Sequence, residues 1–404
     1  MKKFFLLLFL AITSISATAQ IKDFDFKIYG QVRADLFYNS RANVESVDGL
    51  FYSYPKDYDY DAAGEDLNAT DNSNMYLVYS RLGLDLKGPK LGSASTSAKI
   101  EFDFRGSGTT LSTVRLRHAY FNFDWSKSSL LVGQTWHPLY GDVAPQILNL
   151  NMGSPFQPFS RAPQVRFRYN LSNVRLTASA LWQSQYLSNG IDGKSNKYIK
   201  NSCVPEFYFG ADYKTKNLIV GAGVDVLSIV PRTQATVGAE IFKVSERVTS
   251  VSGEVHIKYT TPMWYLAAKS VLGSNLTQVS MLGGYGVKSI EPITGEQDYS
   301  VNRNSSTWVN VVYGSKWKAG IFLGYMKNLG TTDAVSKMYG TGTDVDQLLS
   351  GSAEITYNLP HWKIGFEYNY TSAYYGDLNH ANGKIINTHS VGNNRIVASV
   401  LYMF

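Results

Sequence analysis

An alternation of apolar and polar residues recurs along almost the whole chain, in segments of about ten residues. Segment 96–105 has it most clearly, with Ala98, Ile100, Phe102 and Phe104 between Lys99, Glu101, Asp103 and Arg105. Successive side chains of a β-strand point to opposite faces, so this period of two predicts strands with one apolar and one polar face. No segment has a convincing helical period, and we therefore expect an all-β chain.

The same period predicts sixteen strands, an even number as in bacterial single-chain membrane barrels. They lie at 26–38, 76–87, 96–105, 113–124, 129–135, 163–170, 174–185, 204–214, 217–228, 249–260, 263–273, 304–314, 316–328, 349–358, 361–373 and 394–404. Region 276–303 has room for one further pair, which would make eighteen strands.

The connections between these strands alternate strictly between short and long. The short ones are 88–95, 125–128, 171–173, 215–216, 261–262, 315 and 359–360. The long ones are 39–75, 106–112, 136–162, 186–203, 229–248, 274–303, 329–348 and 374–393. Outer-membrane barrels have short periplasmic turns and longer extracellular loops, so the alternation predicts a transmembrane antiparallel β-barrel with both termini at the short-turn end.

Aromatic residues and the end of the chain favour the same fold. Four tryptophans lie within two residues of a short turn: Trp125, Trp264, Trp317 and Trp362. Tryptophan prefers the membrane interface, whereas the core of a soluble β-sandwich would not concentrate it beside one class of turn. The chain ends mid-strand on Phe404, and a barrel must pair its last strand with its first. Phe404 is therefore predicted to take part in barrel closure.

The first nineteen residues have the pattern of a secretory signal peptide. Lys2 and Lys3 precede the apolar stretch 4–12, and Ala17-Thr18-Ala19 is a cleavage site. We expect a signal peptide at 1–19 and a single barrel domain at 20–404. A net charge of +6 without a Lys/Arg-rich run argues against nucleic acid as a partner.

Motifs of catalysis and cofactor binding are few. The sequences H-E-x-x-H, G-x-S-x-G and C-x-x-C do not occur, and the six histidines lack metal-ligand spacing. We therefore predict a protein that is not an enzyme and has no cofactor and no metal. Spacing alone does not exclude a barrel lipase with serine and histidine on its outer face.

The long connection 136–162 differs from the other loops in being rich in proline and apolar residues. It contains Pro145, Pro155 and Pro158 together with Ile147, Leu148, Leu150, Met152, Phe156 and Phe159. Such a loop needs a surface to pack on, and the inner wall of a barrel would provide one. We predict that this third loop folds inward and narrows the lumen; the alternative is an ordinary surface loop.

Arginines at lumen-facing positions flank this loop. They are Arg33, Arg81, Arg115, Arg117, Arg166 and Arg168, with Arg161 at the end of the loop. Arginine stays charged and hydrogen-bonds carboxylates in a fork, so these residues predict a pore wall that favours anions. An equally weighted alternative is that they solvate the lumen and pair with Asp35, Asp85, Glu101 and Asp103.

Four stretches and the terminal Phe404 resemble Gram-negative trimeric porins of the general-porin and dicarboxylate-porin kind. The stretches are 28–35 (IYGQVRAD), 80–88 (SRLGLDLKG), 117–120 (RHAY) and 132–140 (VGQTWHPLY). The resemblance implies a homotrimer in the outer-membrane lipid of a Gram-negative bacterium, inserted by the barrel-assembly machinery. It also implies that Asp142, the loop's only carboxylate, faces Arg33, Arg81, Arg115 and Arg117 across a constriction. Gln134 is also predicted to be a residue of the pore wall.

The predicted function is passive diffusion of small hydrophilic solutes, with a weak preference for anions or carboxylates. A substrate-specific porin for dicarboxylates or sugars is one alternative. A non-conducting barrel that acts as an adhesin or assembly platform through its long loops is another. The sequence does not identify the natural solute.

Overall fold

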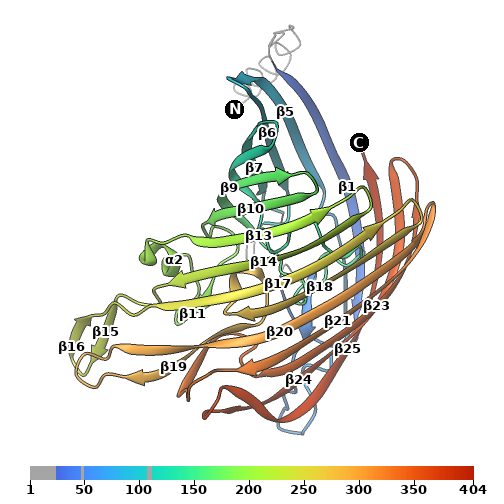
Figure 1. Ribbon diagram of the computed structural model, residues 1–404. Coiled ribbons are helices and arrows are strands. Elements are labelled where there is room, and N and C mark those ends of the chain that lie inside the picture. The colour runs from blue at the N-terminus through green and yellow to red at the C-terminus, as the bar shows by residue number, and fades with distance from the viewer. Residues whose placement is uncertain (1–23, 47–49, 107–111) are drawn as a thin grey trace, which may run out of the picture.

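The computed structural model describes residues 24–46, 50–106 and 112–404 (Figure 1). The predicted signal peptide 1–19 lies outside these residues. The described part of the chain contains no helix that is both long and apolar enough to cross a membrane.

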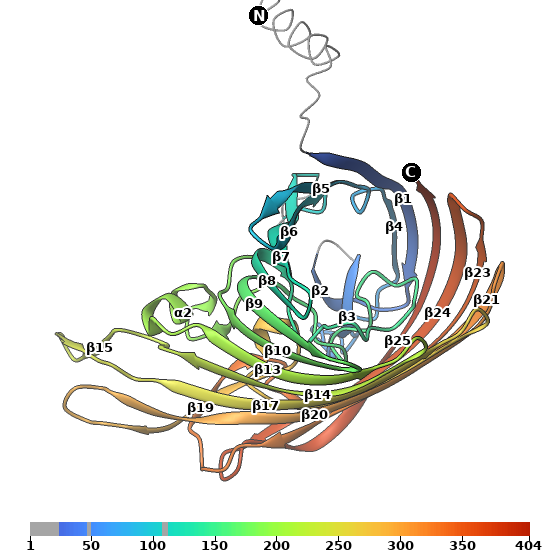
Figure 2. The same cartoon turned by 45° about the horizontal axis from the view of Figure 1, so that its top comes forward.

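The described residues form a closed antiparallel barrel of sixteen wall strands, which confirms the predicted fold class (Figure 2). The wall strands are β1 (Asp25–Asn39), β4 with β5 (Asn72–Tyr76 and Arg81–Leu91), β6 (Ala94–Asp103), β7 (Arg115–Asp124), β8 (Ser128–Trp136), β9 (Arg161–Leu171), β10 (Val174–Leu181), β13 (Glu206–Lys214), β14 (Leu218–Ile229), β17 (Val248–Thr260), β18 (Trp264–Ser274), β20 (Gln297–Gly314), β21 (Trp317–Gly330), β23 (Val345–Asn358), β24 (Trp362–Asn379) and β25 (Lys384–Met403).

The first and last strands close the barrel. β1 pairs with β25 in a register that sets Gln31 opposite Met403 and Asn39 opposite Arg395. One residue further, the Gly30 amide donates to the Phe404 carbonyl at 3.0 Å, and the Phe404 amide donates back at 3.1 Å. The terminal phenylalanine thus completes the ladder between the two strands.

The strand count resolves in favour of sixteen. The expected strand 76–87 is observed as β5, which begins at Arg81; β4 precedes it across an interruption at 77–80, and because both pair with β1 they count as one wall strand. Region 276–303 contains β19 (Gly283–Ile290), which pairs with the beginning of β20 and with β22 (Lys337–Thr341). β19 therefore extends the sheet beyond the wall and adds no spanning pair.

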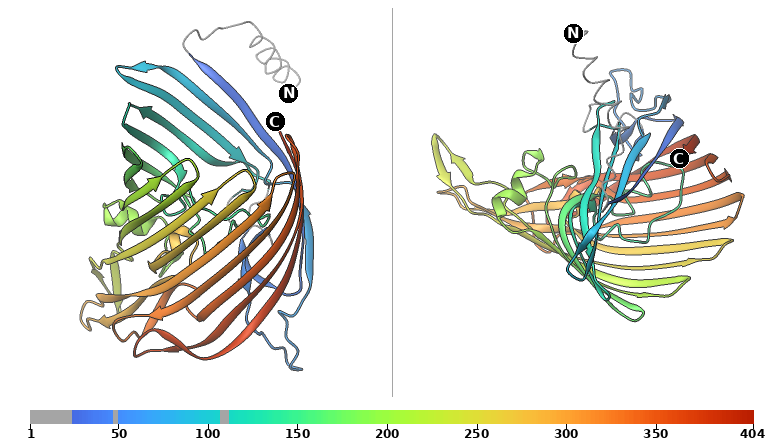
Figure 3. Two further views of the ribbon diagram at one scale, coloured as in Figure 1. Left: turned by 45° about the vertical axis from the view of Figure 1, so that its right-hand side comes forward. Right: turned by 90° about the horizontal axis from the view of Figure 1, so that it is seen from above.

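The long loops contain further short elements, most of them at the end of the barrel opposite the C-terminus (Figures 1 and 3). These are β2 (Asn43–Ser46), β3 (Phe51–Pro55), β11 (Asn189–Gly190), β12 (Gly193–Lys194), α2 (Lys197–Ser202), β15 (Gln234–Val237), β16 (Glu240–Lys243) and the 3-10 turn Thr277–Val279. Helix α2 has six residues, too few for a helical period to be visible in the sequence.

The barrel has an apolar outside and a polar inside, the reverse of a soluble protein. On β24, Ile364 and Phe366 are 48% and 47% exposed, whereas Glu367, the next residue along the same strand, is 1% exposed. At the short-turn end, aromatic rings pair across strands, as Trp264 does with Tyr313 at 4.6 Å between ring centroids. An apolar surface with an aromatic girdle is the form that lipid requires of a transmembrane barrel.

Two loops fold into the barrel. The third loop, 137–160, packs Leu139, Val143 and Phe156 in one buried cluster with Trp308 and Phe322 of the opposite wall, which confirms the predicted inward fold. The second inward segment is the hairpin β2–β3, which contacts the inner faces of β24 and β25. The sequence did not predict this hairpin.

Candidate pore constriction

The third loop is held across the lumen by hydrogen bonds from separate wall strands. Lys269 of β18 donates to the Leu139 carbonyl at 2.5 Å and to the Tyr140 carbonyl at 3.1 Å. A Glu367 carboxylate oxygen of β24 accepts from the Leu148 and Asn149 amides at 2.7 and 3.0 Å. Irregular backbone inside a protein needs such partners, because a buried unpaired amide or carbonyl is costly. The wall thereby fixes the position of the loop.

Arg33 links the loop to the first strand. Its guanidinium donates to the Leu148 carbonyl at 2.7 Å and binds Asp35 at 2.8 Å. On β20, the Asn310 side chain accepts from the Gln146 amide at 2.8 Å. The loop is therefore tied to β1, β18, β20 and β24.

A cavity of about 480 Å³ lies between the loop and the wall that β1, β5, β6 and β7 form. Its wall side has Gln31, Arg33, Tyr79, Arg81, Glu101, Arg117, His118, Trp136 and Lys363, and its loop side has Tyr140, Pro145, Gln146, Ile147, Leu150, Met152 and Phe159. The charged lining thus consists of four cations and one carboxylate. The narrow space beside the inward loop is the candidate constriction of a pore.

Wall carboxylates neutralise part of the arginine charge. Arg115 binds Asp103 at 2.5 Å, and Arg117 binds Glu101 at 2.6 Å and Asp103 at 3.0 Å. Arg81 lies 4.0 Å from Glu101. These arginines therefore pair with wall carboxylates, as the alternative interpretation of the sequence expected. The exception is Asp85, which binds Lys99 at 2.9 Å instead of an arginine. The geometry leaves a net positive but moderate charge at the constriction.

Asp142 does not face the arginines that the resemblance implied, and that expectation is wrong. Its carboxylate binds Arg175 of β10 at 2.7 Å and Lys214 of β13 at 3.0 Å. Burial raises the pKa of Asp142, but Arg175 and Lys214 outweigh burial and hold the pKa well below its usual range. Gly141, at a φ of 61°, turns the loop so that Asp142 reaches β10 and β13 and lies outside the constriction lining.

The remaining predicted wall residues have structural contacts. Arg161 is fully buried, with its guanidinium 4.7 Å from the ring centroid of Trp136 and 3.1 Å from the Tyr186 hydroxyl. Arg166 donates to Gln164 at 2.8 Å and to the Trp136 carbonyl at 2.5 Å. In the described residues, no carboxylate forms an ion pair with either guanidinium.

Gln134 and Arg168 also lie outside the constriction. The Gln134 amide donates to the Leu116 carbonyl at 3.0 Å and accepts from the Ser184 hydroxyl at 2.8 Å. Arg168 of β9 lies opposite Ser129 and Thr177 on the neighbouring strands. Of the predicted site residues, Arg33, Arg81 and Arg117 therefore meet at the constriction, and the others do not.

A second cavity, of about 250 Å³, lies toward the long-loop end. It is lined by Phe51, Arg105, Gly106, Arg115, Gln185, Tyr186, Leu187, Lys194, Thr277 and Ser280. Its charged lining is entirely cationic. Burial and the neighbouring Arg105 lower the pKa of Lys194.

Three cationic residues that line these cavities were not among the site residues predicted from the sequence: Arg105, Lys363 and Lys194. Lys363 lies on β24 with the same parity as the buried Glu367, and Arg105 lies two residues beyond the end of β6 with the parity of Glu101 and Asp103, so parity alone would have found both. Lys194 lies in a loop hairpin, where the sequence has no such signal.

Solved porins and other outer-membrane proteins match this closed barrel in fold over nearly the whole chain. The outer membrane channel DcaP of Acinetobacter baumannii matches with a TM-score of 0.68 at 19% identity, over 95% of this chain and 99% of its own. The trimer form of OmpT of Vibrio cholerae matches with a TM-score of 0.54 at 15% identity, over 95% and 100%. OmpF of Salmonella typhi, in complex with daunomycin, matches with a TM-score of 0.54 at 12% identity, over 94% and 97%.

At these identities the likeness establishes the fold. No family model and no curated protein sequence matches this chain.

Proposed function

We propose that this protein is a porin of the Gram-negative outer membrane, a passive diffusion channel for small hydrophilic solutes that weakly prefers anions, carboxylates in particular. The observation that carries the proposal is the third loop, which is tied across the lumen beside a cavity whose charged lining is four cations and one carboxylate. The fold shared with DcaP, OmpT and OmpF supports it.

The mechanism follows from size and charge. The inward loop limits the solutes that pass, and the wall cations set which charge is favoured. At an effective dielectric constant of about 20, two unit charges about 4 Å apart interact by about 4 kcal/mol. A difference of about 1.4 kcal/mol already changes the occupancy of the constriction by an ion tenfold. Because Glu101, Asp103 and Asp35 pair with Arg117, Arg115 and Arg33, the expected preference is weak.

The assembly proposed for the chain is a homotrimer embedded in outer-membrane lipid. OmpT of similar fold occurs in a trimer form, which supports this state. The barrel-assembly machinery is the proposed partner during insertion, with Phe404 at the strand that closes the barrel.

Lys363 offers a clean test of the charge preference. It lines the constriction, and the described residues contain no ion pair of its ammonium with a carboxylate. Replacing Lys363 with Gln should lower the anion-to-cation permeability ratio by about twofold, measured as reversal potential in planar bilayers across a salt gradient. Lys87→Gln is the matched control, because its side chain is 80% exposed and paired with Asp25 near the chain's start.

The salt concentration of that experiment decides how clear the result is. Screening length falls from about 30 Å at 0.01 M salt to about 3 Å at 1 M, so the wild-type preference should fade as salt rises. A wild-type channel that is clearly cation-selective at low salt would overturn the proposed role of the wall cations.

A carboxylate-specific porin is the second candidate. The second cavity favours it, because Arg105, Arg115 and Lys194 are its charged lining. Block of single-channel current by a dicarboxylate at concentrations where a sugar has no effect would support it. Absence of any conductance would instead favour a non-conducting barrel that acts through its long loops.

A further inference from the structure

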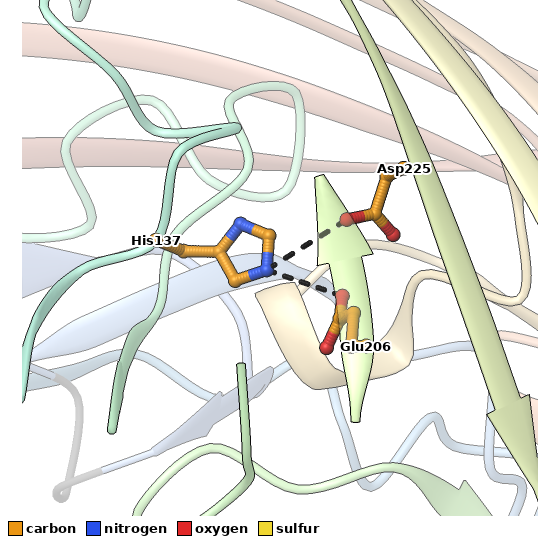
Figure 4. Close-up of side chains that lie close together, drawn as sticks. All are labelled: His137, Glu206 and Asp225. Atoms are coloured by element: carbon orange, nitrogen blue, oxygen red, sulfur yellow. Dashed lines mark hydrogen bonds and ion pairs between the residues drawn. The ribbon is translucent and has the colours of Figure 1, made fainter. Parts of the chain in front are cut away.

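Three titratable side chains meet at the root of the third loop, away from the constriction (Figure 4). His137 directly follows β8, Glu206 begins β13, and Asp225 lies on β14. The Nε2 atom of His137 is 3.1 Å from a Glu206 carboxylate oxygen and 4.0 Å from an Asp225 carboxylate oxygen. Each side chain is only 1% exposed, so the cluster is closed to bulk water.

The hydrogen bonds of this cluster leave several acceptors without donors. Glu206 accepts from His137 and, at 2.8 Å, from the Gln278 side-chain amide. Both carboxylate oxygens of Asp225 and the side-chain oxygen of Gln278 are buried and have no hydrogen-bond partner. A buried acceptor without a donor destabilises the folded state, and a buried carboxylate without a partner does so more strongly.

The charges of the cluster are also unbalanced. No ion pair with lysine or arginine involves Glu206 or Asp225 in the described ranges, so two buried carboxylates have one imidazole as their sole charged partner. A bound cation would compensate both carboxylates and fill the space between them and His137, which one of the unpartnered oxygens of Asp225 faces (Figure 4). The three ligand atoms lie within 4.8 Å of one another.

We propose that His137, Glu206 and Asp225 form a binding site for a divalent transition-metal cation, with zinc preferred. Zinc takes nitrogen and oxygen ligands at about 2.0–2.2 Å, which places neighbouring ligand atoms of a tetrahedral site about 3.4 Å apart. The observed 3.1 and 4.0 Å bracket this separation. Imidazole with carboxylates suits zinc better than calcium or magnesium, which prefer oxygen alone.

Binding changes the protonation of the histidine ring. The Leu139 amide donates to Nδ1 of His137 at 3.2 Å, so a neutral ring carries its proton on Nε2. A cation at Nε2 takes the lone pair of that nitrogen. The ring proton then moves to Nδ1, the contact with Leu139 opens, and any proton shared by the carboxylates goes to solvent. Acid therefore weakens the site.

The cation would fasten the loop to the wall. His137 belongs to the loop, whereas the two carboxylates belong to neighbouring strands whose Phe207 and Val226 are paired. A metal at this point joins the loop root to β13 and β14. The site stands independently of the proposed channel function.

The barrel contains a matched control for this site. His256 also has two carboxylate neighbours, with Nε2 2.9 Å from Asp212 and Nδ1 2.9 Å from Glu254. Its carboxylates bind opposite ring nitrogens, so they do not converge on one point. A histidine between carboxylates is thus compared in two geometries within one protein.

The test uses the full mature chain, refolded in detergent and freed of metal with a chelator. Zn²⁺ is titrated in competition with a chromophoric chelator, and the temperature at which the folded band is lost on gels is measured with and without Zn²⁺. Wild type and His256→Gln are expected to bind one Zn²⁺ per chain and to unfold at a higher temperature with it. Asp225→Asn and Glu206→Gln are expected to weaken binding by about tenfold or more.

Co²⁺ provides a readout that does not depend on any variant. Intense visible absorption of a tetrahedral nitrogen–oxygen site in the wild-type protein supports the proposal even where a variant fails to fold. Wild type without stoichiometric Zn²⁺ binding would overturn it, because the cluster would then hold a proton only. Binding that is unchanged in Asp225→Asn and lost in His256→Gln would overturn it as well.

Discussion

At the scale of single residues, several buried polar side chains in the lumen hydrogen-bond the third loop and hold it in place. Glu367 binds two loop amides, Lys269 binds two loop carbonyls, and Arg33 binds one more. Such pairs are worth more inside a barrel than at a surface, because removal of one partner leaves the other buried and unpaired. The loop position is therefore determined residue by residue.

Lys269 tests this view. It is 2% exposed, and its ammonium is bonded to the carbonyls of Leu139 and Tyr140. Lys269→Met keeps much of the volume but leaves both carbonyls without that donor, so we expect a loss of about 1–3 kcal/mol of stability and larger, noisier single-channel currents. Urea unfolding and bilayer recordings measure the two effects. Conductance and noise equal to wild type would mean that other contacts suffice to hold the loop.

The alternating position of each arginine along its strand predicted which arginines face the lumen. Their partners depend on which residues of the neighbouring strand lie opposite them. Arg115 meets Asp103 because these residues lie opposite each other on β7 and β6. Asp142 was misplaced for a related reason: the direction of its side chain follows from the turn at Gly141, which period and composition do not reveal.

At the scale of elements, two inward segments fill the barrel interior, and only one had a sequence signal. Proline and apolar content marked loop 137–160. Hairpin β2–β3 contains one proline, Pro55, and its position depends on single contacts, such as Tyr375 donating to the Pro55 carbonyl at 2.7 Å and Asn151 donating to the Tyr52 carbonyl at 2.9 Å. These contacts join segments far apart in sequence and depend on how the closed barrel places them, so a local sequence pattern does not predict them.

Shortening the third loop should open the pore. Deleting the residues between Pro145 and Pro158 removes Leu148 and Phe156 from the interior, whereas β8 and β9 keep their pairing from Ser128–Tyr169 to Trp136–Arg161. We expect a folded, heat-modifiable barrel with higher single-channel conductance. A deletion of similar length in loop 229–248, around hairpin β15–β16, is the control and should leave conductance near wild type. Equal conductance in both deletions would place the size limit elsewhere.

At the scale of the whole molecule, the barrel is defined by its closure. Strand count, alternation of turns and loops, and the apolar terminus predicted a closed barrel, because each follows from the rule that no sheet edge remains in lipid. The interruption at 77–80 was not predicted. Region 276–303 was expected to have room for a further strand pair, but the pairing of β19 with β20 and β22 was not predicted, because it changes which strands are neighbours without altering the period of two.

Closure depends on a contact between the two ends of the chain. Phe404 exchanges two backbone hydrogen bonds with Gly30, and a Cβ added at Gly30 would lie 2.6 Å from the Arg81 carbonyl oxygen and 2.7 Å from the Phe404 ring. Deleting Phe404 removes both bonds, worth about 1 kcal/mol each, and Phe404→Asp places a charge at the membrane interface. Gly30→Val forces the ends apart from the other side. All three changes should lower the amount of heat-modifiable barrel recovered from outer membranes, whereas Phe404→Tyr, which keeps the ring and the backbone bonds, should assemble like wild type. If the deletion and Gly30→Val both assembled at wild-type levels, the pairing of Gly30 with Phe404 would have no part in closing the barrel.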